Sequence, residues 1–408
     1  MSGNRIKISF LGDIMFEEPF LRAARKADST YDFNKAFEGL REICAESDIV
    51  VGNLETPLAG EDKGYTNEMY SFNTPDSCVS AIKNMGVTCV LTANNHCCDR
   101  GIEGLKRTLE VLDRHTISHT GSFDGEENNT PYIIELEGVK IAIISCTAST
   151  NASRTKCSVT ADHVNLMQMQ LTAPADRSLI ASIKGFLKNR MIGEKNFIKM
   201  RIKAGLSPKK MSTDNILNVK AVQPYIDRIS DQIEMAKGEA DVVFVCPHMG
   251  GQFNVIPGAF SEYAMKSIAN AGVDAIVGSH PHIVQKAELK GTVPCIFSIG
   301  NVSMSMSTLY ILRDELPDYG VMMHFYLKNG KMDEVTYSLI VMDEIKDGYV
   351  IVKTAYDMVC SSSLEKKEKI IANAERVVRR LTRDEDVCLD KIEKEFVLFG
   401  ANRMRNRS

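Results

Sequence analysis

Residues that could bind a metal ion or a phosphate follow five short apolar runs of this 408-residue chain. They are Asp13, Glu55, Asn95, His96, His248, His280 and His282. Carboxylate, amide oxygen and imidazole together form a ligand set that suits Mn²⁺, Fe or Zn²⁺. Two such ions ~3.5–4 Å apart can hold a phosphoryl group and activate water near neutral pH. The residues therefore predict a divalent-metal site with one or two ions.

The apolar runs also predict how these side chains are positioned. Each run is short and suited to a buried strand, and helical patterns over about 17–28, 74–85, 102–114 and 260–271 alternate with them. In open α/β sheets the ligand site lies beyond the carboxyl ends of the strands. We therefore expect an α/β fold in which residues distant in sequence meet at one edge. A single histidine at a strand end is usually a hydrogen-bonded loop residue, but a whole set of ligand types is harder to explain in that way.

The pattern divides the chain into three parts. Strand and helix signals alternate over 1–150 and 237–345, which we interpret as one core. The intervening 151–236 is predicted to be a helical basic insertion, and 346–408 a C-terminal strand and helical extension with a helical pattern over about 364–397. From Lys184 to Lys210 there are nine Lys or Arg and one acid.

The basic segment has three interpretations. Lys184, Lys188 and Arg190 could bind an anionic polymer next to the site, because a concentrated positive charge attracts polyanions. The segment could instead be a pair of amphipathic helices with a solvated charged face, or a basic surface that lies on a membrane.

Composition and charge exclude several classes of protein. The net charge of −4 (49 basic against 53 acidic residues) argues against a generic nucleic-acid binder. No apolar stretch is long enough to form a transmembrane segment. Eleven cysteines without zinc-site spacing favour a cytoplasmic location, with peripheral contact at the membrane left open. Cys97 and Cys98, beside His96, could ligate metal or respond to oxidants, although small buried residues are commoner there.

Six short motifs occur in the order found in one protein family. They are Gly12-Asp13-Ile14-Met15, Asn53-Leu54-Glu55-Thr56-Pro57, Asn94-Asn95-His96-Cys97-Cys98-Asp99, His248-Met249-Gly250, Gly278-Ser279-His280-Pro281-His282 and Ser298-Ile299-Gly300-Asn301. The chain thus resembles the CapA-type poly-γ-glutamate capsule-synthesis proteins of the calcineurin-like metallophosphoesterase superfamily, over roughly 5–147 and 238–303. The resemblance implies a four-layer αββα sandwich whose ligands come from loops after the strands.

The resemblance also implies individual roles. Asp13 and His282 would hold one ion, and Asn95, His248 and His280 a second. Metallophosphoesterases usually have Asp-x-His in the first motif, whereas here the third position is Met15, so one site is expected to be weaker. The usual bridging aspartate is also not obvious.

Further roles follow from the same resemblance. Glu55 is the best substitute for the bridging aspartate and Asn53 the second. His96 would give a proton to the leaving oxygen, and Asp99 would orient it. Asn53 and Asn301 are expected to contact the substrate.

Two functions are consistent with these residues. The first is a metal-dependent hydrolase of the CapA type that acts on a phosphoester or a capsule-type polymer. The second is a non-catalytic, polymer-binding accessory subunit of a capsule or envelope-polymer machine, with capsule-synthesis proteins as candidate partners. The His96–Asp99 pair favours the first, whereas Met15 and the basic segment favour the second.

Overall fold

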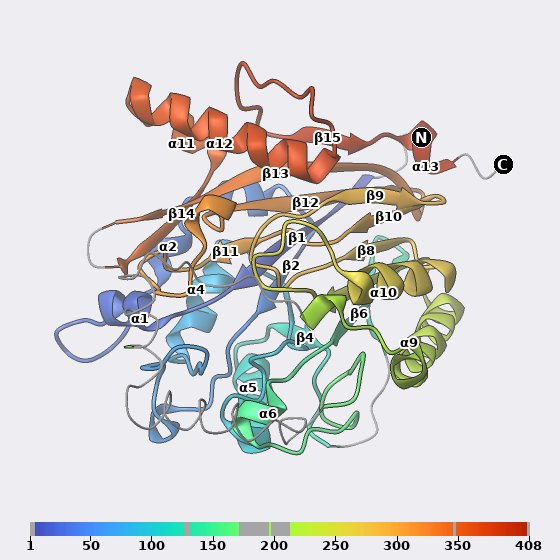
Figure 1. Cartoon of the computed structure of the whole chain (residues 1–408), viewed down its shortest axis with the longest axis horizontal. Helices are drawn as coiled ribbons and strands as arrows, with labels where there is room; N and C mark the ends of the chain where they lie inside the picture. Colours follow the sequence, from blue (N-terminus) through green and yellow to red (C-terminus); the bar gives the residue numbers. More distant parts are fainter. Residues whose placement is uncertain (1–4, 126–130, 171–195, 197–212, 346–347, 406–408) are drawn as a thin grey trace.

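Two β-sheets packed face to face form the centre of the protein (Figure 1). The computed structural model describes residues 5–125, 131–170, 196, 213–345 and 348–405. The first sheet has the order β14-β13-β12-β1-β2-β3-β4, with β11 paired to β1 and β15 paired to β13. Its strands are β1 Arg5–Ile14, β2 Ile49–Leu54, β3 Cys89–Leu91, β4 Ser118–Thr120, β11 Asn301–Ser303, β12 Tyr319–Lys328, β13 Lys331–Glu344, β14 Val350–Thr354 and β15 Phe396–Phe399.

The second sheet has the order β5-β6-β7-β8-β10-β9. Its strands are β5 Tyr132–Leu136, β6 Val139–Thr147, β7 Val242–His248, β8 Ala275–Val277, β9 Ala287–Lys290 and β10 Val293–Ile296. Strands β1 to β4 run parallel in the first sheet, as do β6, β7, β8 and β10 in the second. The parallel strands of each sheet therefore end at a common edge.

Aromatic rings fill the space between the sheets. The centroid of the Phe10 ring lies 5.1 Å from that of Phe244 and 5.5 Å from that of Phe325, and the last two are 5.1 Å apart. All three rings are fully buried and belong to one apolar cluster with side chains of both sheets. Such tilted and edge-on contacts are the favoured packing of aromatic rings.

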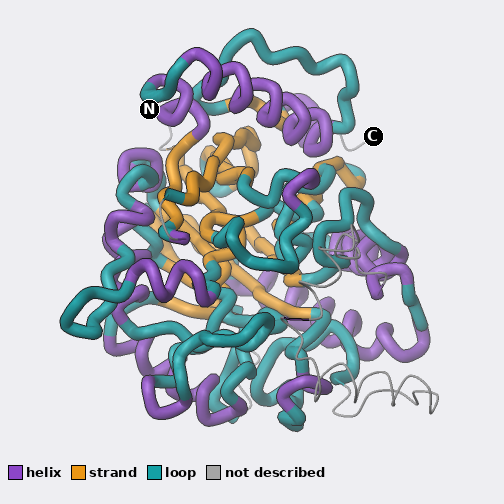
Figure 2. Tube along the Cα trace, turned by 60° about the vertical axis from the view of Figure 1, so that its left-hand side comes forward, coloured by secondary structure: helices purple, strands orange, loops and turns teal. Residues whose placement is uncertain are grey.

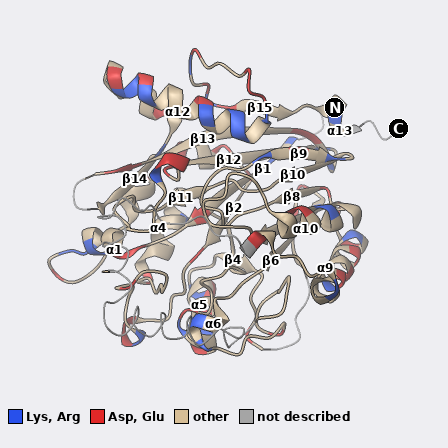
Figure 3. Ribbon diagram, viewed as in Figure 1, with Lys and Arg blue, Asp and Glu red and all other residues tan. Residues whose placement is uncertain are grey.

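Helices cover the outer face of each sheet, which confirms the predicted αββα sandwich. Against the first sheet pack α1 Glu18–Ala24, α2 Asn34–Phe37, α3 Arg41–Ala45, α4 Ser77–Met85 and, nearby, α5 Gly101–Arg114. Against the second pack α9 Val219–Glu239 and α10 Ala259–Asn270. The 60° view of Figure 2 shows the strands enclosed by these helices. In Figure 3 the charged side chains concentrate on the helices, such as α9, rather than on the central strands.

The segment predicted as a basic insertion is described only in part. Residues 171–195 and 197–212, which include Lys184, Lys188 and Arg190, lie outside the described residues. Its last part is α9, which buries Ile226, Ile229 and Ile233 against the second sheet. This helix therefore packs as a layer of the sandwich.

The C-terminal extension completes the first sheet and covers its end. After β14 come α11 Ala355–Cys360 and α12 Leu364–Thr382, which runs above the sheets in Figure 1 and buries Val377 and Leu381. The helical pattern predicted to about 397 ends at Thr382, because Arg383 is left-handed (φ 58°) and Asp384 accepts a hydrogen bond from the backbone N–H of Asp386. Such local side-chain bonds compete with helix. The chain then forms β15 and α13 Ala401–Arg405.

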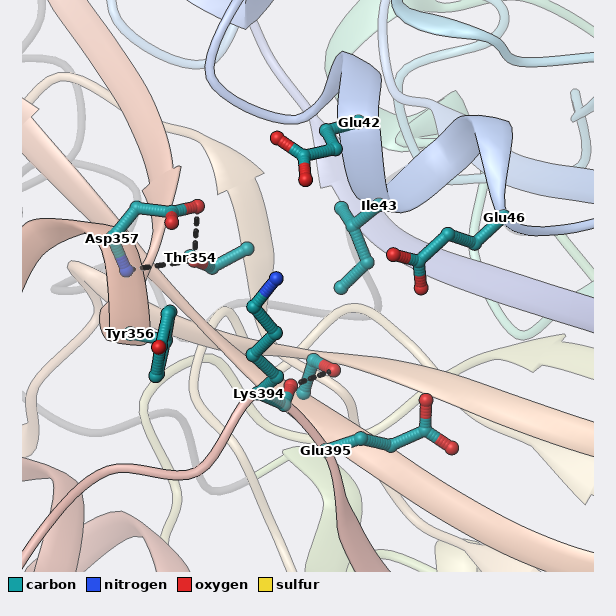
Figure 4. Close-up of a pocket in the computed structure, with 9 residues that line it drawn as sticks. Glu42, Ile43, Glu46, Thr354, Tyr356, Asp357, Lys394 and Glu395 are labelled. Carbon is teal, nitrogen blue, oxygen red and sulfur yellow. Dashed lines mark hydrogen bonds between the residues drawn. The ribbon is translucent and has the colours of Figure 1, made fainter.

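A small cavity of about 40 Å³ marks where this extension meets the core (Figure 4). The hydroxyl of Thr354 caps α11 by accepting the N–H of Asp357, at 3.0 Å. Lys394 extends into the cavity between the carboxylates of Glu42 and Glu46 on one side and Asp357 on the other. Among the described residues, no helix combines the length and apolar character needed to cross a membrane.

Candidate metal centre

The ends of five strands bring the predicted ligand residues together. Asp13 lies near the end of β1, and Glu55 follows β2 directly. Asn95 and His96 follow β3, His248 ends β7, and the loop after β8 carries His280 and His282. Contacts between the two sheets cross this edge: the backbone N–H of His280 donates to Asp13 Oδ2, and Asn53 Nδ2 lies 3.2 Å from His248 Nδ1.

Gly12 lets the first strand approach its neighbour closely. In the β1–β2 pairing Leu11 faces Gly52 and Asp13 faces Asn53, so Gly12 is an extra residue that forms a bulge. A Cβ on Gly12 would lie 1.9 Å from the carbonyl oxygen of Gly300. Bulges commonly redirect a side chain at a functional site. Here the bulge turns Asp13 toward the histidines of the second sheet.

Asp13 is fully buried and held from both sides. Its Oδ1 accepts a hydrogen bond from Asn53 Nδ2 at 2.7 Å. Its Oδ2 accepts one from the backbone N–H of His280 at 3.1 Å and lies 3.2 Å from His282 Nδ1. Burial by itself would raise the pKa of Asp13, but the His282 contact, His248 and Asn53 outweigh it and lower the pKa to about 2. The side chain is therefore a carboxylate at neutral pH.

Glu55 is also fully buried, yet neither of its carboxylate oxygens has a hydrogen-bond partner among the described residues. Its Oε1 lies 3.6 Å from His248 Nε2, 3.7 Å from His282 Nε2 and 4.0 Å from His96 Nε2. Burial, and then the charge of Asp13, raise the pKa of Glu55 well above its usual value. A buried carboxylate without a partner costs several kcal/mol.

The residues around Glu55 have the types and spacing that could hold a divalent cation. Ligand atoms of Asp13, Glu55 and His248 lie within 4.8 Å of one another, and so do those of Glu55, His280 and His282. Glu55 belongs to both groups, which is the position of a bridging ligand. The cation would supply the opposite charge that both carboxylates otherwise lack.

Three of the side chains around Glu55 form a second, closely spaced group. His248 Nε2 lies 2.7 Å from Asn95 Oδ1 and 3.1 Å from His280 Nδ1. The other ring nitrogen of His248, Nδ1, lies 2.9 Å from Ser279 Oγ. A partner on one imidazole nitrogen fixes the tautomer and leaves the other free to bind a metal. The resemblance implies these three residues for the second ion, an assignment that stays a prediction.

The environment keeps these imidazoles neutral, which is the form that binds metal. Burial, reinforced by His280, lowers the pKa of His248 well below its usual value. Burial, with His282, lowers that of His280 to about 3. His280 (φ 99°) and His282 (φ 57°) both have left-handed backbones, which side chains other than glycine adopt at a cost. This strained loop turns both rings toward Glu55.

His96 and Asp99 form a tight pair at the edge of the centre. The distance from His96 Nδ1 to Asp99 Oδ2 is 2.6 Å. The same carboxylate oxygen accepts the backbone N–H of Phe72 at 2.7 Å, and the Phe72 ring packs on the imidazole with centroids 4.2 Å apart. The Nε2 atom of His96 therefore faces Glu55 and the ligand group.

Asn53 and Asn301, expected to contact substrate, lie buried and hold other site residues in place. Asn53 Nδ2 bonds to Asp13 and lies 3.2 Å from His248 Nδ1. Asn301 Oδ1 lies 3.0 Å from His282 Nδ1, and its Nδ2 donates to the backbone carbonyl of His282 at 2.9 Å. The structure thus places both amides behind the ligands, where they orient them.

Met15 does not enter the centre. Its side chain is buried in the apolar cluster on the helix side of the first sheet, and its backbone N–H bonds to Ser303. Of the motif Gly12-Asp13-Ile14-Met15, Asp13 is therefore the residue that faces the centre. No motif marked Phe72, whose contact with His96 depends on the long loop between β2 and α4.

Comparison with known proteins identifies relatives of this chain. A family model described as "Bacterial capsule synthesis protein PGA_cap" matches residues 7–305. The PGA biosynthesis protein CapA of Bacillus subtilis is 24% identical over 74% of this chain and 63% of its own length. The capsule biosynthesis protein CapA of Bacillus anthracis is 23% identical over 73% of this chain and 59% of its own length. The chain thus spans less than two thirds of these relatives.

Solved structures show only distant similarity. A putative 5′-nucleotidase from Staphylococcus aureus is 11% identical, with a TM-score of 0.41, over 91% of this chain and 58% of that one. A hypothetical protein from Thermus thermophilus is 13% identical, with a TM-score of 0.39, over 86% and 98% of the two chains. Because the family model spans most of the sequence, including every residue of the candidate metal centre, the chain belongs to the bacterial PGA_cap capsule-synthesis family.

Proposed function

We propose that the protein is a metal-dependent hydrolase that cleaves a phosphoester or a bond in a capsule-type polymer. One observation carries the proposal. Glu55 is a buried carboxylate with no hydrogen-bond partner among the described residues, and imidazoles surround it. A general acid–base pair, His96 and Asp99, faces the same carboxylate. A purely structural role does not require that pair.

The residues divide into holding and reacting groups. Asp13, Glu55 and His282 would hold one divalent ion, and Asn95, His248 and His280, again with Glu55, a second. The mutual distances also allow Asp13 to act with His248, and His280 with His282. Mn²⁺, Fe or Zn²⁺ bound there would polarise the scissile group and activate water. Asn53 and Asn301 keep Asp13, His248 and His282 oriented.

His96 is the residue that moves a proton in this proposal. In this proposal Asp99 Oδ2 accepts a hydrogen bond from the Nδ1–H of His96 and so orients the ring, while Nε2 faces the centre. A proton on Nε2 can pass to the leaving oxygen as the bond to it breaks. The Phe72 N–H and ring fix Asp99 and His96, which limits the number of orientations of the pair.

The test is hydrolysis of a generic phosphodiester and a phosphomonoester, such as the p-nitrophenyl esters, with Mn²⁺ titrated in. The His96→Ala variant should lose turnover and keep its metal content. His119→Ala is a matched control, because His119 contacts Asp113 outside the centre. Unchanged turnover in His96→Ala would contradict the role of His96.

The second candidate function is a non-catalytic, polymer-binding accessory subunit of a capsule-synthesis complex. The burial of Met15 in the apolar core favours it, because the first strand then supplies fewer metal ligands. Binding of an anionic polymer such as poly-γ-glutamate, with steep salt dependence and no turnover, would support this function. Reversing charges at Lys184, Lys188 and Arg190 should then abolish binding.

The proposed location is the cytoplasm, with peripheral contact at the membrane. All eleven cysteines are free thiols, as is usual in a reducing compartment. Fractionation of cells that produce the tagged protein would test this, and recovery with secreted or surface proteins would contradict it.

A further inference from the structure

Three thiols gather beside the His96–Asp99 loop, outside the metal-ligand group. Cys97 and Cys98 lie in that loop, with their sulfur atoms 3.7 Å apart. Cys157 comes from the segment after α6 (Ala152–Thr155) and packs against the apolar cluster that contains Cys97 and Cys98. Apolar side chains such as Val159 and Val164 surround the group. Cys98 thus lies beside Cys97, and Cys157 packs on the cluster that holds them both.

The three thiols differ in exposure and acidity. Cys97 and Cys98 are buried, whereas Cys157 is partly exposed. Interaction with the neighbouring Cys98 thiol lowers the pKa of Cys157 to about 6, and interaction with Cys157, then with Cys97, and burial raise the pKa of Cys98. A partly exposed cysteine with a low pKa is the type of thiol that oxidants attack. A second thiol in contact with it can resolve the oxidised product.

The segment that carries Cys157 rests on the loop next to His96. Arg154 donates hydrogen bonds to the backbone carbonyls of Met69 and Tyr70, at 3.2 and 3.3 Å, and its guanidinium lies 4.9 Å from the Tyr70 ring centroid. Asn151 and Lys156, which flank α6, are both left-handed. The short helix thus lies between two left-handed residues and is held on the β2–α4 loop by Arg154.

We propose that Cys157 and Cys98 form a peroxide-sensitive thiol pair that ties the His96–Asp99 loop to residues 152–157. The Cys157 thiolate attacks one oxygen of hydrogen peroxide, the O–O bond breaks, and water leaves after protonation, which gives a sulfenic acid on Cys157. The sulfur of Cys98 then attacks that of Cys157, the S–O bond breaks as the disulfide forms, and the hydroxyl group leaves with the Cys98 proton as a second water. In total, two thiols are oxidised by two electrons and one peroxide is reduced to two waters.

The disulfide would act on the loop that carries the proton donor. Cys98 lies between His96 and Asp99, whose contact of 2.6 Å depends on the path of that loop. A disulfide between Cys98 and Cys157 would tie this loop to residues 152–157, the segment whose Arg154 donates a hydrogen bond to the backbone carbonyl of Tyr70. The inference goes beyond the proposed hydrolysis, and its test does not depend on any activity.

The test is thiol mapping of the folded full-length protein after brief treatment with hydrogen peroxide. The protein is quenched with an alkylating reagent, digested without reduction, and examined by mass spectrometry. The expected result is a cross-linked pair of peptides that contain Cys98 and Cys157, lighter by two hydrogen atoms and separable by dithiothreitol. Cys97→Ser is the matched control and should still form it, whereas Cys98→Ser should leave Cys157 oxidised without a cross-link.

Other products would overturn the proposal. These are a Cys97–Cys98 bond, a Cys157–Cys157 bond between two chains, and a Cys157 sulfinic acid without any cross-link in the wild-type protein. Full alkylation of Cys157 after the peroxide treatment would overturn it as well. Because the wild-type protein alone distinguishes these outcomes, the result stands even if a variant fails to fold.

Discussion

Replacing Glu55 by glutamine should stabilise the metal-free protein and weaken its response to metal. Glu55 is fully buried, and its oxygens have no hydrogen-bond partner among the described residues. Its pKa lies well above the usual 4.5 because of burial and the charge of Asp13. Without metal the protein can avoid the buried charge only by binding a proton. At pH 7, protonating a group of ordinary pKa 4.5 costs about 1.36 × 2.5, or roughly 3 kcal/mol.

This cost sets the magnitude of the effect. Glutamine removes the charge but leaves a buried amide, which costs about 1–3 kcal/mol if it finds no partner. We therefore expect metal-free Glu55→Gln to exceed the wild-type protein in free energy of unfolding by up to about 2 kcal/mol at pH 7. A group whose pKa is raised in the folded state contributes stability below its unfolded pKa and loses that contribution as the pH rises. The advantage of the variant should therefore shrink as pH falls toward 4.5.

The assay is urea unfolding of chelator-treated protein, repeated with Mn²⁺. Metal at 100 times its Kd should stabilise the wild-type protein by about 2.7 kcal/mol. The variant should gain much less. Glu395→Gln is the control and should instead lower the free energy of unfolding. Contacts with Thr336, Tyr326 and Lys7 outweigh burial and lower the pKa of Glu395 to about 2, so its charged form stabilises the fold. A variant less stable than wild type without metal, with an undiminished metal response, would refute the reasoning.

Three further predictions follow from single contacts. His324 is buried between Ser9 and Ser338. Burial and Lys7 lower its pKa to about 3, although the Glu395 charge acts in the opposite direction. The free energy of unfolding should therefore fall as the pH drops from 6.5 toward 3, by at most about 5 kcal/mol. Acid unfolding of His324→Gln should show a shallower loss, and an identical pH profile would contradict this. Asp99→Asn should lower turnover about 10²–10⁴-fold with metal content unchanged, as measured by initial rates, and a normal rate would contradict the pairing with His96. Asn53→Ala should weaken metal binding about 10–100-fold in calorimetric titrations, whereas wild-type affinity would remove its positioning role.

The convergence of the site could be predicted because it follows from sheet topology. Asp13, Glu55 and His248 are far apart in sequence, but each ends or follows a parallel strand, so one edge collects them. Glu55 belongs to both candidate ligand groups, and its bridging role stays a prediction. Such features depend on strand ends, which apolar runs reveal directly.

Other features depend on contacts that no local pattern contains. Phe72 reaches His96 through a loop without a motif, and α9 becomes a layer of the sandwich because the second sheet covers its apolar face. The orientation of Asn53 behind Asp13 requires the bulge at Gly12. The helix after Leu364 ends at Thr382 because a local bond of Asp384 replaces the next helical turn.

Metal analysis of the purified protein tests the central claim most directly. Protein prepared without chelators and dialysed with Mn²⁺, Fe²⁺ or Zn²⁺ should retain about one to two ions per chain by plasma mass spectrometry. His248→Ala should lose most of that metal, whereas His119→Ala, outside the centre, should keep it. Wild-type protein that binds no divalent ion, or a His248→Ala variant that binds as much as wild type, would contradict the assignment of this edge of the sandwich as a metal centre.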